Sequence, residues 1–215
     1  AKMGGAAVAG YQMLKPAIAF DKQMSANQAV LELKKNSAEL KLLHDQAITE
    51  GARSAYSATQ AAKAQYELAA GGFNTKQVLD ALPGTLNLAA AGQVELATAA
   101  QIAVGTLNGF GLSANQISRM NDVLVGTVNK TSTGVEDLGE AMKYAAPIAK
   151  VYGASLEQTS AMLGILGNNS IKGSEAGTGL RAIMASHPTR VRGLKQEPAD
   201  SQKYFEGRTP HGCVD

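Results

Sequence analysis

The chain has 215 residues, of which 45% are hydrophobic and 5% are aromatic, and it contains no tryptophan. Twenty lysines and arginines stand against eighteen acidic residues, so the formal net charge is +2. These charges are scattered and form no basic stripe, so we expect no specific binding of nucleic acid. The only cysteine is Cys213, which excludes an internal disulfide framework. The length allows one sizeable domain or two small ones.

Residues 1–35 are predicted to form an N-terminal helical segment rich in alanine and glycine. The apolar run from Gly4 to Leu14 is shorter than the roughly 20 residues needed to span a bilayer. A helix of small residues is the favoured interpretation. A signal-peptide core, or part of a longer apolar membrane segment, stays open as an alternative. The chain does not begin with methionine, which suggests a fragment or a processed product.

Residues 36–185 are predicted to form a helical core, because one helix-start signal recurs along them. At six places a short oxygen-bearing residue stands three positions before a Glu or Gln, which is the spacing of a capping box. The six pairs are Asn36/Glu39, Ser57/Gln60, Asn74/Gln77, Ser113/Gln116, Thr133/Glu136 and Ser155/Gln158. Each precedes a stripe of apolar residues spaced by three or four, which predicts a helix. No alternation with period two appears, so no sheet is expected.

Glycines between the stripes are predicted to end the helices. They are Gly51, Gly71, Gly72, Gly92, Gly109, Gly111 and Gly153. Pro83 and Pro147 fall inside stripes and are expected to kink or split their helices. Because the helix spacing varies, the recurring capping boxes are not expected to mark a solenoid repeat. The predicted fold class is all-α, a compact array of short-to-medium amphipathic helices joined by short Gly/Asn/Ser turns.

The stretch from Gly164 to Leu180 is the most unusual part of the predicted core. Gly167, Asn168, Asn169 and Ser170 predict a turn between two helices, and Ser174 is expected to cap the second one. Each glycine in that second helix, at 177 and 179, weakens an isolated helix by about 1 kcal/mol relative to alanine. Their presence therefore predicts close packing of this helix against a neighbour.

Two charged residues in the same stretch invite a functional interpretation. A phosphate-binding loop needs the order G-x-x-x-x-G-K-[ST] after a strand, which the order Lys172, Gly173, Ser174 after a helix does not provide. Arg181 is expected to pair with a carboxylate or a helix C-terminus inside the bundle, with partner binding as the second possibility.

Residues that could carry chemistry are few, and no catalytic residue, metal site or cofactor loop is predicted. His44 is interpreted as a solvated helix residue, and His211 with Cys213 lacks the further ligands of a metal site. Acidic residues near one helix start, Glu136, Asp137 and Glu140, are explained by the helix dipole. Residues 186–215 hold three of the six prolines and no apolar period, which predicts a disordered tail.

Two motifs resemble the core region of bacteriophage tail tape measure proteins. They are AMKYAAPIA at residues 141–149 and IKGSEAGTGLR at residues 171–181, within a resemblance that covers Leu40 to Met184. In that family the last helix usually continues, so the tail from residue 186 is predicted to lie outside the family. The resemblance implies packing or partner contacts for ten motif residues: Lys143, Tyr144, Pro147, Lys172, Gly173, Ser174, Gly177, Thr178, Leu180 and Arg181.

What the resemblance implies is a structural, non-enzymatic role without cofactors. Tape measure proteins, which this chain resembles, are long and mainly helical, and they set the length of the tail during assembly. A helix rises about 1.5 Å per residue, so its length can serve as a measure of distance. The implied partners are tail tube and tail assembly proteins, in the virion tail and in the host cytoplasm during assembly, with self-association left open. The alternative is a membrane-active helical protein that aids envelope penetration, and a small helical enzyme ranks third.

Overall fold

The computed structural model describes residues 5–186 of the chain, with side chains from residue 14 onward. The all-α prediction is confirmed, because the described residues form nine α-helices and one short 3-10 helix and contain no strand. The elements are α1 (Gly5–Val30), α2 (Ala38–Arg53), α3 (Ala58–Ala70), α4 (Thr75–Gly92), α5 (Leu96–Phe110), η1 (Ala114–Gln116), α6 (Ile117–Val128), α7 (Val135–Val151), α8 (Leu156–Asn168) and α9 (Gly173–Ser186).

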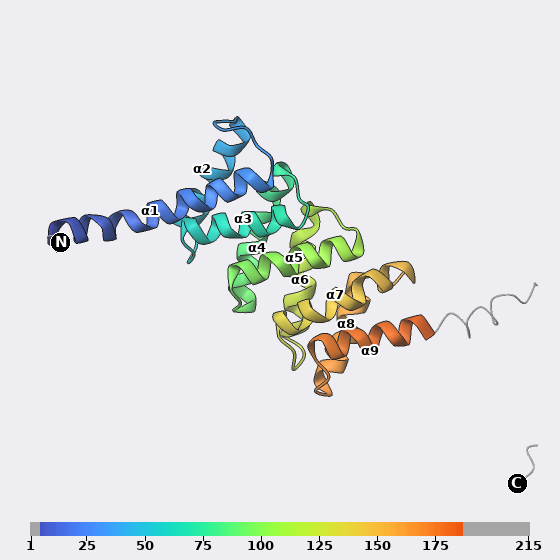
Figure 1. The fold of residues 1–215 in the computed structure, drawn as a ribbon. Coiled ribbons are helices and arrows are strands. Elements are labelled where there is room, and N and C mark those ends of the chain that lie inside the picture. Colours follow the sequence, from blue (N-terminus) through green and yellow to red (C-terminus); the bar gives the residue numbers. More distant parts are fainter. Residues whose placement is uncertain (1–4, 187–215) are drawn as a thin grey trace, which may run out of the picture.

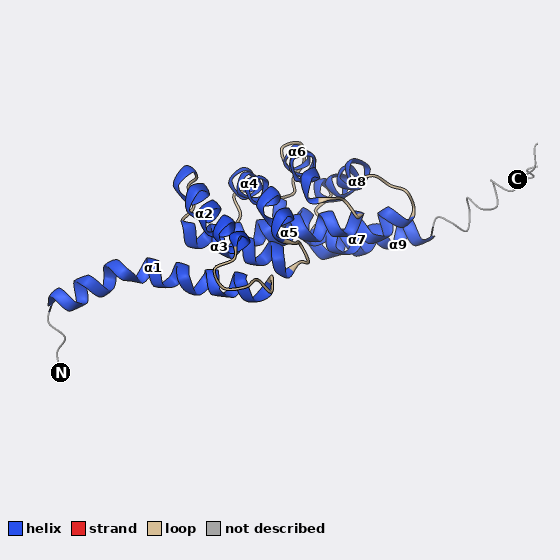
Figure 2. Cartoon of the chain, turned by 90° about the horizontal axis from the view of Figure 1, so that it is seen from above, coloured by secondary structure: helices blue, strands red, loops and turns tan. Residues whose placement is uncertain are grey.

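The helices are arranged in two layers that alternate along the chain. One layer holds α1, α3, α5, α7 and α9, and each of these odd-numbered helices packs against the next one in the series. The second layer holds α2, α4, α6 and α8, which follow one another in the same way. Figure 2 shows the two layers. Figure 1 shows that successive helices are displaced in one direction along the molecule, from α1 to α9. This arrangement is an α-solenoid.

A regular repeat underlies the odd-numbered layer. Helices α3, α5, α7 and α9 begin at Ala58, Leu96, Val135 and Gly173, so successive starts lie 38, 39 and 38 residues apart. The prediction that the capping boxes mark no solenoid repeat was therefore wrong. The physical reason is that the spacing in the even-numbered layer is irregular: its helices begin at residues 38, 75, 117 and 156, so successive starts lie 37, 42 and 39 residues apart. The capping boxes belong to helices of both layers. The irregular spacing of the even-numbered helices therefore masks the regular spacing of the odd-numbered ones.

Three of the predicted capping boxes form as expected. The side chains of Ser57, Asn74 and Ser155 accept hydrogen bonds from the backbone N–H three residues on, and a glutamine side chain returns the bond in each case. At Ser113 the backbone N–H donates to Gln116 Oε1 at 3.3 Å, and the box opens η1 rather than an α-helix. The sequence signal thus locates four helix starts correctly.

Two predicted boxes are displaced by one residue. Asn36 takes a left-handed conformation with φ of 63°, and Ser37 accepts the hydrogen bond from Leu40 N at 3.2 Å instead. Asparagine tolerates this conformation, so the chain turns there and the next oxygen-bearing residue caps the helix. Thr133 is likewise not the cap, since Gly134 precedes α7 and its N–H donates to Asp137 Oδ2 at 3.4 Å.

The predicted helix ends hold in most places. α3, α5 and α7 end before Gly71, Gly111 and Gly153, and Gly92 is the last residue of α4. Two glycines were wrongly predicted as ends: α2 continues past Gly51 to Arg53, and Gly109 lies inside α5, where it packs against Ala146 of α7.

Neither proline splits its helix. Pro83 removes the N–H that would bond the Leu79 carbonyl within α4, but Gln46 Nε2 donates to that oxygen at 2.7 Å and replaces the lost bond. Pro147 is exposed on the surface of α7, which also remains one helix from Val135 to Val151. The predicted splitting of these two helices was therefore wrong.

A buried polar network ties the first four helices together. Asn27 Nδ2 on α1 donates to the Ala62 carbonyl at 2.9 Å and to Gln65 Oε1 at 3.2 Å. Gln65 Nε2 on α3 donates to the Leu43 carbonyl at 2.9 Å and to Gln46 Oε1 at 3.1 Å. Both Asn27 and Gln65 are fully buried, and buried polar groups with partners fix the register of the elements that carry them.

Candidate partner-binding surface

The two motif segments form neighbouring helices of the odd-numbered layer, α7 and α9. Their backbones approach closely at Gly177, where an added Cβ would lie well inside 3.0 Å of the Ala141 backbone. One repeat earlier, Gly139 occupies the equivalent position and would meet the Ile102 side chain in the same way. The predicted close packing is therefore correct for Gly177. It was wrong for Gly179, where an added Cβ would meet nothing within 4 Å.

The ten motif residues divide into a buried and an exposed set. Gly177 and Leu180 are buried between the helices, and Gly173 is half-buried at the start of α9. The remaining seven are exposed: Lys143, Tyr144, Pro147, Lys172, Ser174, Thr178 and Arg181. Ser174 does not cap α9 as predicted, because the helix begins one residue earlier at Gly173, which has φ of 54°. A partner role for these residues stays a prediction.

Five exposed motif residues share one side of α7 and α9, and we call them the α7/α9 strip: Lys143, Tyr144, Pro147, Thr178 and Arg181. Lys143, Tyr144 and Pro147 fall within one face of α7 at helical spacing. Lys143 and Arg181 occupy equivalent positions one repeat apart, so the strip runs across the two helices.

Charge pairing differs between the two cations of the strip. Lys143 Nζ forms an ion pair with Glu140 one turn earlier on α7. Arg181 is exposed and forms no ion pair with any other residue in the described part of the chain. The predicted pairing of Arg181 inside the bundle was wrong, because the residue is exposed on α9 and no carboxylate among the described residues pairs with it. A guanidinium that no group within the described residues pairs with can bind a carboxylate of another molecule.

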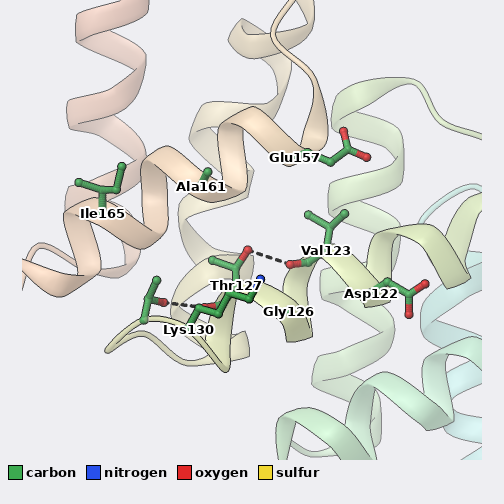
Figure 3. Close-up of a pocket in the computed structure, with 9 residues that line it drawn as sticks. Asp122, Val123, Gly126, Thr127, Lys130, Glu157, Ala161 and Ile165 are labelled. Carbon is green, nitrogen blue, oxygen red and sulfur yellow. Dashed lines mark hydrogen bonds between the residues drawn. The ribbon is translucent and has the colours of Figure 1, made fainter.

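A shallow groove of about 410 Å³ lies between α6 and α8 in the other layer. Its lining comprises Asp122, Val123, Gly126, Thr127, Lys130, Thr131, Glu157, Ala161 and Ile165 (Figure 3). The hydroxyls of the two threonines donate to backbone carbonyls within the chain: Thr127 donates to the Val123 carbonyl and Thr131 to the Thr127 carbonyl, both at 2.8 Å. The groove was not predicted from the sequence. The sequence feature that could have indicated it is a pair of small residues, Gly126 on α6 and Ala161 on α8.

One ion pair bridges the two helices at the end of this groove. Arg119 on α6 lies 2.7 Å from Glu157 Oε1 on α8, and both side chains are about half exposed. A backbone hydrogen bond at the start of α8 lowers the pKa of Glu157, and the hydrogen bond and charge of Arg119 lower it further. The pair therefore stays ionised at neutral pH and joins neighbouring repeats.

Few other groups in the described residues suggest chemistry. His44 lies on α2 with 42% of its side chain exposed, which fits the predicted solvated helix histidine, and it packs edge-on against the Phe20 ring with ring centroids 5.1 Å apart. No group of three or more potential metal ligands occurs among residues 5–186. His211 and Cys213 lie outside the described residues. None of the described helices combines the length and apolar character needed to cross a bilayer.

Comparisons with known proteins give one consistent result. The family model described as phage-related minor tail protein matches residues 44–206, which extends beyond Met184, the end of the resemblance found in the sequence. The chain is 39% identical over 174 residues to a "Tape measure protein" of Pneumococcus phage Dp-1, which covers 80% of this chain and 15% of that protein. It is also 39% identical over 178 residues to a "Probable tape measure protein" of Escherichia phage P2, which covers 83% of this chain and 22% of that protein.

The chain thus spans less than a quarter of the length of either curated relative. No solved structure matches it.

Proposed function

Because this chain belongs to the family of phage-related minor tail proteins, we propose that it is a structural segment of a tail tape measure protein. Its role is to take part in tail assembly and tail length determination through protein–protein contacts. The observation that carries this proposal is the family match, since the matched residues contain the solenoid from α3 to α9. The solenoid presents helix surfaces to its surroundings, as proteins built from stacked repeats generally do.

The proposed partners are the tail tube protein and other tail assembly proteins, and the proposed contact surface is the α7/α9 strip. Tyr144 and Arg181 support this choice, because aromatic and arginine side chains are enriched where protein interfaces are strongest. Tyr144 has 36% of its surface exposed although it is a large hydrophobic residue. The corresponding location is the virion tail, preceded by the host cytoplasm during assembly. The proposed role needs no catalytic residue and no cofactor.

Co-purification tests the proposed surface. The tagged chain is mixed with the tail tube protein of the same phage, and the retained tube protein is quantified for the wild type, for Tyr144→Glu and for Arg181→Glu. We expect each substitution to reduce retention at least tenfold, because each removes an anchor of the proposed contact. Leu42→Glu is the matched control, since Leu42 is 55% exposed on α2, away from the strip.

Equal retention by all four proteins would remove the strip from the proposal. A failure of the wild-type chain to retain any tail protein would count against the structural role itself.

A further inference from the structure

The groove between α6 and α8 lies inside the stack, between two consecutive helices of the even-numbered layer. The two helices run in the same direction, because Arg119 pairs with Glu157 near their starts and Thr131 lies beside Gly164 further along. α9, from which the chain continues beyond residue 186, belongs to the other layer (Figure 2). The groove is therefore a lateral surface of the stack, and it does not arise where the described residues end.

Each wall of the groove is a row of residues at steps of four, the spacing of one helix face. The rows are Asp122, Gly126 and Lys130 along α6 and the turn after it, and Glu157, Ala161 and Ile165 along α8. The middle of each row is a small residue. An added Cβ at Gly126 would meet nothing within 4 Å, so the centre of the groove has room for a side chain from outside.

The floor of the groove is apolar. The methyl groups of Thr127 and Thr131 face Gly164, where α8 comes closest to α6, and both hydroxyls donate to backbone carbonyls of the same chain. Ile165 stands at the rim with 62% of its surface exposed. An apolar side chain therefore gains by leaving water here, whereas a polar small molecule finds few hydrogen-bond partners.

Opposite charges stand at the two ends of the groove, as Figure 3 shows. One end carries the carboxylates of Asp122 and Glu157, of which only Glu157 is paired, with Arg119. The other end carries Lys130. Asp122 and Lys130 are exposed, and neither forms an ion pair within the described residues. Eight residues separate them, which is about 12 Å along a helix.

A partner helix repeats the spacing of these walls. When helices pack, a row of side chains at steps of four lies in the groove between two such rows of the facing surface. Three successive side chains of that row then lie at the carboxylate end, at the centre between Gly126 and Ala161, and at Lys130. Complementary groups at these places are a basic residue, a large apolar residue and an acidic residue.

We propose that the groove binds an amphipathic helix of another protein, with a basic, a large apolar and an acidic residue at steps of four along its facing row. This is recognition of a helix by a groove, in which the apolar residue is the anchor and the two charges set the register. The partner is identified by the groove alone, independently of the α7/α9 strip and of the proposed role in a phage tail.

Titration of the isotope-labelled chain with a synthetic helical peptide tests the proposal. The probe is an alanine- and glutamine-rich peptide of about 18 residues with Arg, Leu and Glu at steps of four in its centre. We expect it to shift the backbone amide NMR signals of α6 and α8 and to leave those of α3 unchanged. The contact is smaller than the about 1,200–2,000 Å² of stable interfaces, so the dissociation constant should lie between about 10 μM and 1 mM.

Filling the centre of the groove should abolish this binding. Gly126→Leu occupies the place of the probe's leucine, so we expect it to weaken binding at least tenfold. Gly105→Leu is the matched control, because an added Cβ there also meets nothing within 4 Å and Gly105 lies on α5, outside the groove. This control should bind the probe as the wild type does.

A charge exchange tests the ends of the groove. Asp122→Lys places a lysine at each end, and a second peptide carries Glu in place of the probe's Arg. The wild type should prefer the first peptide by about threefold, and Asp122→Lys should prefer the second, because one exposed ion pair is exchanged for a repulsion. Asp122 is exposed, so helical content measured by circular dichroism should not change.

Four results would overturn the proposal. The first is the absence of shifts in α6 and α8 at about 1 mM peptide. The second is equal binding by the wild type and Gly126→Leu, and the third is an unchanged peptide preference in Asp122→Lys. The fourth is binding that appears only after residues 187–215 are removed, which would show that this segment of the chain occupies the groove.

Discussion

At the scale of single residues, two glycines in one helix have opposite roles. Gly177 lies where the backbone of α9 approaches Ala141, and no larger residue fits there without movement of one helix. Gly179, two positions on, points away from α7 into open space. Sequence alone gives both the same cost in helix propensity, so only the packing distinguishes a required glycine from a permissive one.

A pair of alanine substitutions tests this distinction. Gly177→Ala should lower the free energy of unfolding by about 1–3 kcal/mol, because the added methyl group overpacks the contact with Ala141. Gly179→Ala should raise it by about 0.5–1 kcal/mol, because alanine favours the helix and meets no neighbour. Urea unfolding at low protein concentration, followed by circular dichroism, measures both. Changes of the same sign would contradict the packing of α9 described above.

The Arg119–Glu157 pair gives stability a pH dependence of known sign. The pKa of Glu157 is lowered from its ordinary value of 4.5 by folding, so the ionised carboxylate favours the folded state. This contribution is fully present above pH 4.5 and is lost as the pH falls through the lower pKa of the folded protein. Both side chains are about half exposed, so the effect should be small, at most about 1 kcal/mol.

Glu157→Gln should therefore be less stable than the wild type at pH 7, and the difference should shrink as the pH falls below 4.5. Thermal unfolding of both proteins between pH 3 and 7 measures it. A difference that grows on acidification would contradict the direction of the pKa change.

At the scale of elements, a polar network holds the beginning of the solenoid together. Gln65 links α3 to α1 and α2, and Gln46 extends the network to the Leu79 carbonyl that Pro83 leaves free on α4. A buried amide with all these partners specifies one arrangement of four helices, which an apolar residue of similar size does not.

Gln65→Leu should lower the free energy of unfolding by about 2 kcal/mol, because the Leu43 carbonyl and Gln46 Oε1 lose a buried donor. Hydrogen exchange should accelerate in α1 and α2 more than in α7 and α9, since repeats unfold locally. Gln101→Leu is the control: its side chain is exposed and bonds only the Glu67 carboxylate, so it should change stability by less than about 0.5 kcal/mol. Uniform acceleration in all helices would contradict a local role for the network.

The helices also differ in how well the sequence predicts where they begin and whether they continue. Local sequence signals suffice where one side chain satisfies one backbone group of its own helix. The helix starts predicted at Ser57, Asn74 and Ser155 are of this kind, and all three are correct. They fail where a more distant residue intervenes. Pro83 does not break α4 because Gln46, from another helix, supplies the missing donor, and no local pattern contains that information.

The candidate surface was predicted only in part, for the same reason. The motifs at residues 141–149 and 171–181 select the two helices that carry the α7/α9 strip. Which motif residues are exposed depends on how α9 packs on α7. The buried Leu180 and the exposed Arg181 are neighbours in sequence, yet only their positions around α9 separate them.

At the scale of the whole molecule, the repeat changes what this segment contributes to length. In a straight helix, 39 residues extend about 58 Å at 1.5 Å per residue. In this solenoid the same number of residues adds one step of the odd-numbered layer, and packed helices lie about 8–10 Å apart. The segment is therefore a compact element of a proposed tape measure, and the greater part of any measured length has to come from other parts of the protein.

Deletion of residues 96–134, which removes one repeat and joins α4 to α7, tests this estimate in the phage that encodes the chain. We expect the tail to shorten by no more than about 10 Å, because one layer step is lost. Electron microscopy of negatively stained tails gives the length distribution. Shortening by about 58 Å would show that these residues are extended as a single helix within the tail.

The most direct test of the central claim, that this chain acts through protein contacts in a phage tail, is site-specific photo-crosslinking in assembled particles. A photoreactive amino acid replaces Tyr144 in one strain and Leu42 in another, and cross-linked products from purified tails are identified by mass spectrometry. We expect that position 144 cross-links to another tail protein and that position 42 does so weakly or not at all. Absence of the chain from purified tails, or cross-links from neither position, would contradict it.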